Sequence, residues 1–548
     1  MLCPFWAVCV GPRKKPSVEN ADARCCPPRL QVLCALFSPA NAFAPSLPAH
    51  KLSGARRLPV CGRQRPAAAG LRSVAAAPPA GSSAPRAQGK AAEKVPKTRV
   101  TTVEEFRRVI KEGSALNTLE VVGDTARTGP HPVLEVLAQR RAEGSKPMQR
   151  TDKYKVALAI EGGGMRGCVS AGMASALIDA GLGDCFDEVY GSSAGSLVGA
   201  YWIANSFGMV QYGCSLYYDL LTGKNSKKFF IDKTRALTLL GFGFARYFTP
   251  RYFKEVVGLR PKGLPLLNLQ YLLRSCVEDM RPLDWEGFAA RQKLIPLHIV
   301  ASDVVAKKAV DLTLKGGHWS NIREMTLAMT ASMNLPAIAG PLVKLDSIKD
   351  GLLADAQLFE PVPFKSALAN GCTHVLVLRT RPDGINCMPR PSKVEAGMMK
   401  NFFADMPDVA DYLIQMKHKE VYCEDILRLN QATKSPQQQG AACAQLFAIA
   451  PQEGVAEIGR LERGRGVIFD GVKEGYCTSV GVLKSHPGLW PEADADTTAE
   501  EATERAFPVD LLDEAPAFSR SSWIDSYLGR RDEMTKNGAV GCAPFNIH

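Results

Sequence analysis

The sequence has no apolar run long enough for a membrane-spanning helix, and no cysteine pair with the spacing of a zinc site. Its apolar stretches fall short of the roughly 18–20 residues that a spanning helix needs. The 16 cysteines are scattered, six of them within residues 1–61, without a C-x-x-C pair or a Cys/His cluster. We therefore expect no transmembrane segment, no bound metal, and reduced, mostly buried thiols after residue 61.

A basic excess is also missing from most of the chain. The net charge is +12, but residues 1–100 carry 16 Lys and Arg against three acidic residues. The remaining 448 residues carry 51 basic and 52 acidic groups. This larger part has no bulk electrostatic reason to bind polyanions, and we expect no nucleic-acid partner.

The first hundred residues have the composition of a targeting leader. Residues 50–99 are rich in Ala, Pro, Arg and Ser, which disfavours a packed core. Before them, the apolar run 30–37 precedes Ala-Phe-Ala-Pro at 42–45. Together these parts resemble the bipartite leaders of algae with secondary plastids, so we expect a disordered leader and a plastid location. Because a signal peptide normally stands first, a disordered tail or a misassigned start stays open, with a cytoplasmic or membrane-peripheral protein.

A glycine-rich turn joins a predicted strand to a predicted helix. The apolar run 155–160 favours a buried strand, and EGGGMRG at 161–167 leads into an Ala-rich helical stretch. This arrangement directs backbone N–H groups and a helix N-terminus towards an anion. The turn also matches G-x-G-x-x-G, so a dinucleotide-binding fold stays open, with Asp184 or Asp187 as its acidic residue.

A second strand–turn–helix unit follows and contains the candidate nucleophile. GSSAG at 191–195 has the G-x-S-x-G spacing of a nucleophile elbow, with Ser193 at its centre. Gly191 and Gly195 are the small residues that let strand and helix approach each other. The preceding turn supplies the candidate oxyanion hole, which consists of Gly162, Gly163, Gly164, Arg166 and Gly167.

EGGGMRG followed by GSSAG resembles the patatin-like phospholipase family, whose members are lipid acyl hydrolases with a Ser–Asp dyad. The resemblance covers roughly residues 150–480 and includes an Ala-Ser pair and a proline within 327–355, before Asp350-Gly351. Residues 361–363 and 374–382 are similar to a bacterial branch of the family. The resemblance implies an α/β three-layer sandwich with a mostly parallel central sheet flanked by helices. It departs at Leu352, where the family has Gly or Ala.

The proton acceptor of Ser193 is sought among carboxylates, because no histidine after residue 150 has the setting of a triad base. An aspartate serves as base if burial raises its proton affinity and it lies within hydrogen-bond reach. The Asp-Gly dipeptides at Asp350, Asp383 and Asp470 compete for this role. The neighbouring residues favour Asp350, with Asp355 as second choice, although Leu352 crowds the Asp350 turn.

We therefore expect a serine lipid acyl hydrolase without cofactor, acting on a lipid at a membrane or lipid-droplet interface. Ser193 would attack the ester carbonyl, and Asp350 would accept its proton and later activate the hydrolytic water. A transacylase, a catalytically silent lipid-binding scaffold and a dinucleotide-binding protein remain as alternatives.

The expected organisation has five parts. They are a leader (1–100), a helical extension (101–150), a catalytic domain (151–385), its helical and β completion (386–480), and an acidic linker and tail (481–548). Within the catalytic domain, Lys224–Phe230 and Arg235–Phe248 combine cations, aromatics and apolar residues. These two stretches fit either ordinary core packing or contact with a lipid interface.

Overall fold

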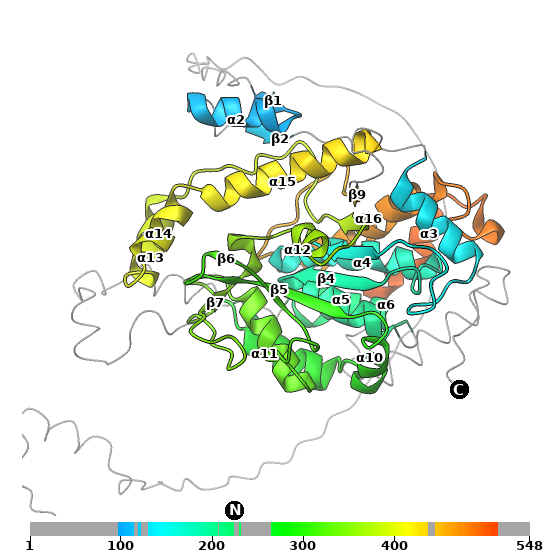
Figure 1. Ribbon diagram of the computed structural model, residues 1–548, viewed down its shortest axis with the longest axis horizontal. Helices are drawn as coiled ribbons and strands as arrows, with labels where there is room; N and C mark the ends of the chain where they lie inside the picture. Colours follow the sequence, from blue (N-terminus) through cyan, green and yellow to red (C-terminus); the bar gives the residue numbers. More distant parts are fainter. Residues whose placement is uncertain are drawn as a thin grey trace, which may run out of the picture. The chain divides into compact units, whose positions relative to one another are not determined.

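Strands and helices alternate along the chain, as Figure 1 shows for the computed structural model. The structure describes residues 97–113, 119–121, 130–205, 208–223, 230–231, 265–436 and 444–512. Most of the predicted leader, nearly all of the two cation–aromatic stretches and the tail after residue 512 lie outside the described residues.

A central sheet carries the fold. Its strands are β3 (Val156–Ile160), β4 (Glu188–Ser192), β5 (Leu297–Asp303), β6 (Lys308–Leu312), β7 (Leu353–Ala354), β8 (His374–Leu378) and β9 (Gln445–Ile449). Among the described residues the order is β6-β5-β4-β3-β8-β9, and β7 pairs with β5. Strands β5, β4, β3, β8 and β9 run parallel, whereas β6 and β7 are antiparallel to β5.

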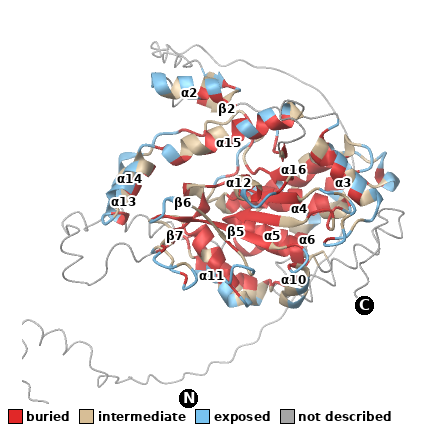
Figure 2. Ribbon diagram, viewed as in Figure 1, coloured by how far each residue is buried: buried red, intermediate tan, exposed pale blue. Residues whose placement is uncertain are grey.

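Both faces of the sheet are buried. On β3, Leu158 and Ile160 belong to one hydrophobic core, and Ala157 and Ala159 belong to another. Because neighbouring side chains of a strand point to opposite faces, the two cores lie on the two sides of the sheet. Helices α4 (Gly167–Asp179), α5 (Ala194–Ala204) and α16 (Arg465–Lys484) cover one face, and α12 (Phe364–Ala369) and α15 (Lys417–Lys434) cover the other (Figures 1 and 2). The predicted three-layer α/β fold is confirmed.

The other helical elements lie around these layers. They are α3 (Pro132–Ala142), α6 (Met209–Ser215), η3 (Leu216–Leu220), η7 (Tyr271–Met280), α10 (Trp285–Arg291), α11 (Ile322–Met333), η8 (Ala356–Leu358), α13 (Lys393–Phe402) and α14 (Pro407–Ile414). Within the described part of the chain, no helix combines the length and apolar character that crossing a bilayer requires.

Two helices on one face approach each other backbone to backbone. A Cβ atom at Gly172 of α4 would lie 2.0 Å from the carbonyl oxygen of Val472 in α16. A Cβ atom at Gly475 would lie 2.0 Å from the carbonyl oxygen of Val169. The glycines therefore fix the position of α4, whose N-terminus faces the candidate site.

The extension before the catalytic domain contains strands as well as helices. The elements are β1 (Thr98–Val100), α2 (Val103–Glu112) and β2 (Leu119–Val121), followed by α3. β1 and β2 form a separate parallel pair, which the expectation of a purely helical extension missed. Thr102 and Glu105 form a capping box at the start of α2, and this explains where the helix begins.

The predicted acidic linker and tail (481–548) contain short helical elements as far as Leu512. The segment contains η10 (Glu492–Asp494), α17 (Ala499–Ala506) and η11 (Val509–Leu512). Thr498 and Glu501 form a capping box, so an acidic residue stabilises the helix start. The ring of Phe507 is buried, with its centroid 5.5 Å from that of Tyr476 in α16. This packing anchors α17 to the core.

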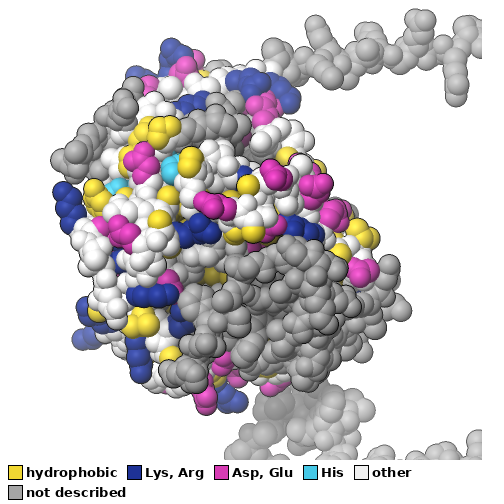
Figure 3. Space-filling model, turned by 90° about the vertical axis from the view of Figure 1, so that its right-hand side faces the viewer, with side chains coloured by type: hydrophobic (Ala, Val, Ile, Leu, Met, Phe, Trp, Pro, Cys, Tyr) yellow, Lys and Arg dark blue, Asp and Glu magenta, His cyan; other side chains and the backbone are white. Residues whose placement is uncertain are grey.

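The described surface carries charges of both signs. In Figure 3, Lys and Arg side chains are interspersed with Asp and Glu side chains. This distribution agrees with the balance of 51 basic and 52 acidic groups after residue 100.

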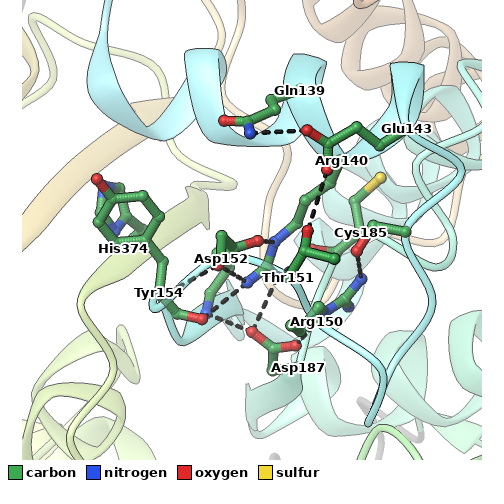
Figure 4. A network of polar contacts seen from close by, with 12 residues as sticks. Gln139, Arg140, Glu143, Arg150, Thr151, Asp152, Tyr154, Cys185, Asp187 and His374 are labelled. Carbon is green, nitrogen blue, oxygen red and sulfur yellow. Dashed lines mark hydrogen bonds and ion pairs between the residues drawn. The ribbon is translucent and has the colours of Figure 1, made fainter.

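A buried ionic network fixes the starts of β3 and β4 (Figure 4). Arg140 of α3 has a fully buried side chain and donates to Asp152 at 2.8 Å and to Asp187 at 2.9 Å. Asp187 also accepts hydrogen bonds from Arg150 and from the backbone N–H of Val156. The network therefore joins the segment before β3 to the residue that precedes β4.

Replacing Arg140 with methionine should lower the free energy of unfolding by about 3 kcal/mol, because the change leaves Asp152 and Asp187 without their shared buried cation. Urea denaturation followed by circular dichroism measures this loss. The control is Arg107→Met, since Arg107 is 58% exposed and pairs with Glu424 at the surface. Equal denaturation midpoints for both variants would contradict a special role of the network.

Candidate active site

Ser193 lies at a sharp turn between β4 and α5. The strand ends at Ser192 and the helix begins at Ala194. Ser193 has φ 51° and ψ −124°, a conformation that costs a non-glycine residue about 1–3 kcal/mol. This geometry places the residue at the carboxyl end of a central parallel strand, where α/β proteins build their sites.

Two glycines allow this turn. A Cβ atom at Gly195 would lie 2.2 Å from the carbonyl oxygen of Ile160 in β3. A Cβ atom at Gly191 would lie 2.4 Å from the Cα atom of Ser196. Neither position has room for a side chain, so the strand and the helix meet closely on either side of Ser193.

The hydroxyl of Ser193 donates a hydrogen bond to Oδ2 of Asp355 at 2.9 Å. Asp355 follows β7 directly, and its other oxygen accepts from the backbone N–H of Gln357 at 2.8 Å. The side chain is buried, and this burial raises its pKa to about 6. The pKa of this carboxyl group is therefore close to neutral pH, and the group accepts a hydrogen bond from the serine hydroxyl.

The prediction of Asp350 for this position was wrong. Asp350 is exposed and lies in the turn before β7, with φ 59°. In the described structure it makes no hydrogen bond to Ser193. Leu352 accepts a backbone hydrogen bond from Val304, so it belongs to the pairing with β5 and does not crowd the serine. The aspartate that contacts Ser193 is Asp355, which lies five residues after Asp350 and directly follows the two-residue strand β7.

Ser332 of α11 holds the elbow in place. Its hydroxyl accepts a hydrogen bond from the backbone N–H of Ser193 at 2.8 Å and donates to the carbonyl of Val300 in β5. The amide of Ser193 is therefore engaged. The next amide, that of Ala194, is at the first position of α5, where a helix leaves N–H groups without an intrahelical acceptor.

The glycine-rich turn lies beside the serine. A Cβ atom at Gly162 would lie 2.7 Å from Cβ of Ser193. Gly163 has φ 146° and Gly164 has φ 61°, which is backbone that other residues rarely adopt. In the described part of the chain, the amides of Gly163 and Gly164 have no hydrogen-bond acceptor. Two free N–H groups in the cleft that contains the serine could bind an oxyanion.

Residues far along the chain support this turn. The hydroxyl of Thr380 donates to the carbonyl of Gly162 at 3.0 Å, and the carbonyl of Arg460 accepts from Met165 at 3.0 Å. Glu161 accepts from the backbone of Thr380 and from the hydroxyl of Tyr422. The turn is thus fixed by the segments that follow β8 and β9 and by α15.

The last two residues of the predicted oxyanion loop have different surroundings. Arg166 ends η2 (Gly164–Arg166), is buried, and forms an ion pair with Glu457 at 2.6 Å. Gly167 begins α4, and a Cβ atom there would lie 2.3 Å from the hydroxyl oxygen of Tyr217. Gly167 therefore allows close packing, whereas Arg166 lines the cleft.

Ser193 and Asp355 line a cleft, and the atom-free space in and around it, which includes open solvent, is about 590 Å³. Gly162, Gly163 and Gly164 line it together with these two residues. Its wall also contains residues that the sequence analysis did not select: Gln357, Arg381, Cys387, Lys419, Tyr422 and Arg460. Arg381 lies in the stretch 374–382 that resembles a bacterial branch of the family, whereas the others share no local motif that connects them to the serine.

A histidine lines the cleft but does not contact the serine. His418 of α15, one of the histidines that the sequence did not favour as a triad base, lies buried in the cleft wall. Burial, together with the charges of Lys419 and Arg460, lowers its pKa to about 3. The hydroxyl of Ser193 donates to Asp355 instead. The carboxylate is therefore the base that the geometry offers.

The acidic residues that a dinucleotide-binding site would use lie elsewhere. Asp187 is part of the network with Arg140 at the amino end of the parallel strands. Asp184 forms ion pairs with Lys146 and Arg291. Neither lines the cleft, so the glycine-rich turn lacks the acidic partner of a dinucleotide fingerprint. Within the described residues, no group of three or more potential ligands is placed to hold a metal ion.

Comparison with known proteins gives a match to a family model and matches to solved structures. Residues 158–368 match the sequence model of the patatin-like phospholipase family. No curated protein matches the sequence. Among the solved structures, the chain matches the crystal structure of VipD from Legionella pneumophila, with 13% identity and a TM-score of 0.28, over 71% of this chain and 81% of that one.

Gly195→Ala should lower the free energy of unfolding by about 2–3 kcal/mol, because the new methyl group meets the backbone of β3. Thermal unfolding measures the change. Gly199→Ala is the matched control on the same helix, because its methyl group would meet side chains and not backbone: those of Leu297 and Val189 at 3.1 Å and that of Ile160 at 3.7 Å. A Gly195→Ala variant as stable as the Gly199→Ala variant would contradict the close approach at the elbow.

Proposed function

Because the chain carries a patatin-like phospholipase domain over residues 158–368, we propose that it cleaves fatty-acyl esters of lipids through a Ser193–Asp355 dyad. The observation that carries this proposal is the 2.9 Å hydrogen bond from the serine hydroxyl to the buried carboxylate. A nucleophile and a base within hydrogen-bond reach are what covalent acyl transfer requires.

In the first step, Oγ of Ser193 bonds to the ester carbonyl carbon, and its proton passes to Oδ2 of Asp355. The carbonyl electron pair moves to the oxygen and gives a tetrahedral oxyanion. When the carbonyl re-forms, the bond to the alcohol oxygen breaks, and the proton on Asp355 passes to the departing oxygen. This step leaves the acyl group on Ser193.

In the second step, Asp355 takes a proton from water as the water oxygen bonds to the acyl carbon. The second tetrahedral intermediate collapses, the bond to Oγ breaks, and the proton returns to Ser193. The products are a fatty acid and the free enzyme. A base with a pKa of about 6 can both accept and return this proton near neutral pH.

Backbone N–H groups would stabilise both oxyanions. Gly163 and Gly164 line the same cleft as Ser193, and the amide of Ala194 directly follows the serine. One such donor contributes about 3–4 kcal/mol at most to the transition state. Helices α4 and α5 both begin at the site, so their N-terminal dipoles add favourable potential.

Ser193→Ala and Asp355→Asn should each reduce kcat/KM for a soluble, uncharged ester by at least about 100-fold, because they remove the nucleophile and the base. The measurement is the steady-state release of the alcohol by the purified full chain. Asp350→Asn is the matched control and should keep the wild-type rate, since Asp350 is exposed. A Ser193→Ala variant with wild-type turnover would rule out this serine.

Activity should fall on the acid side, because protonated Asp355 cannot accept the serine proton. With a pKa of about 6, kcat/KM at pH 5 should be about tenfold below its value at pH 7. Glu360→Gln is the control, since burial raises the pKa of Glu360 to about 7 without contact to Ser193. The acid limb should persist in this variant. A profile that stays flat down to pH 5 would contradict Asp355 as the base.

A further inference from the structure

The cleft around Ser193 is rich in cations. Arg166, Arg381, Lys419 and Arg460 all line it. The lining also contains two carboxylates, but these are engaged. Asp355 accepts from Ser193 and Gln357, and Glu161 accepts from Thr380 and Tyr422 (hydrogen bonds of 2.6–2.9 Å).

One carboxylate outside the lining is shared by two of the cations. Oε1 of Glu457 lies 2.6 Å from Nη1 of Arg166 and 2.7 Å from Nε of Arg381. Glu457 therefore supplies a single negative charge for two guanidinium groups whose side chains are 6% and 12% exposed. The ring of Tyr422 packs against Arg381, with its centroid 5.4 Å from Cζ. This contact orients the guanidinium group without neutralising it.

The hydrogen-bond acceptors of the other two cations are neutral. Nη1 of Arg460 donates to the amide oxygen of Gln357 at 2.7 Å, and Nζ of Lys419 donates to the carbonyl of Pro389. Neither forms an ion pair with a carboxylate in the described part of the chain. Desolvating a cation without an anion is costly, so these side chains are poised for a ligand that supplies one.

A buried donor gives independent support. Nε of Arg166 is buried and has no hydrogen-bond partner among the described residues. Arg166 is 5% exposed, and its Nε would lie 3.0 Å from a Cβ atom at Gly163. This unsatisfied guanidinium N–H therefore belongs to a residue that lines the same cleft as Lys419 and Arg460.

We propose that Arg460, Lys419 and Arg381, with Nε of Arg166, form a subsite for the phosphodiester group of a glycerophospholipid substrate. A phosphodiester offers two unesterified oxygens that share one negative charge, which suits guanidinium forks and an ammonium group. In such a lipid, the phosphate and the acyl esters are attached to one glycerol unit. The phosphate therefore enters the cleft together with the ester that Ser193 attacks.

This inference rests on the proposed function and specifies its substrate. Galactolipids and acylglycerols contain the same ester but no anion, so they would leave the cations unpaired. A site that must pair buried charges rejects a ligand that lacks the partner group. Arg460, Lys419 and Arg381 are accordingly specificity-determining residues for phospholipid over uncharged lipid.

The test compares phosphatidylcholine with diacylglycerol of identical acyl chains, each in micelles of the same uncharged detergent. Phosphatidylcholine is zwitterionic, so attraction to a charged surface does not contribute. For the full chain, kcat/KM for phosphatidylcholine divided by that for diacylglycerol should fall about tenfold or more in Arg460→Met and in Lys419→Met. Arg460→Lys, which keeps the charge, should restore part of the ratio. Using two variants keeps the test valid if one of them fails to fold.

Lys417→Met is the matched control, because Lys417 lies on the same helix as Lys419, is 48% exposed and pairs with Glu420. Its ratio should equal that of the wild type. A ratio that also stays at the wild-type value in Arg460→Met and Lys419→Met would overturn the subsite. A wild-type chain that hydrolyses neither lipid would instead overturn the proposed function.

Inorganic phosphate distinguishes a lipid head group from a free anion. It should inhibit diacylglycerol hydrolysis competitively in the wild type and less in Arg460→Met, while the lipid ratio falls as predicted. If phosphate inhibits but the ratio does not change between wild type and variants, the site binds a free anion and the assignment to a phospholipid is wrong.

Discussion

The hydrogen bond between Ser193 and Asp355 joins two segments that are more than 160 residues apart in the chain, and much of the fold serves to make it. The serine is held at positive φ by two glycines and by the hydroxyl of Ser332. The aspartate is fixed by the pairing of β7 with β5 and by the amide of Gln357. Burial raises the pKa of the carboxyl group, so one contact provides both position and proton affinity.

The charges around this pair have a different origin. The glycine-rich turn and the elbow come from the first strands of the sheet, whereas the cations of the cleft come mainly from residues 381–460. Arg460 contributes both to the support of the glycine-rich turn and to the cations of the cleft. Its carbonyl accepts a hydrogen bond from the amide of Met165, and the residue lines the cleft. The segment after the domain match at 158–368 thus helps to build the site, both as a support and as a wall.

The two motifs could be read from the sequence because each is local. Gly191 and Gly195, which allow the turn at Ser193, each lie within two residues of this serine in the sequence. The aspartate was misplaced because β7 has only two residues, too few for a periodic pattern, and its partner strand lies about fifty residues earlier. The available signal was the apolar pair Leu353-Ala354 directly before Asp355, in contrast to the mixed pair Ile348-Lys349 before Asp350. The cations on α15 and after β9 depend on tertiary contacts, for which one sequence gives no pattern.

Labelling with a fluorophosphonate probe, which reacts with activated serine hydroxyls, tests the central claim most directly. Peptide mass spectrometry of the labelled full chain should place the phosphonyl group on Ser193. The labelling rate should fall strongly when Asp355 is changed to asparagine, because the base that activates the hydroxyl is then absent. A label on another serine, or an unchanged labelling rate at Ser193 in the Asp355→Asn variant, would contradict the account.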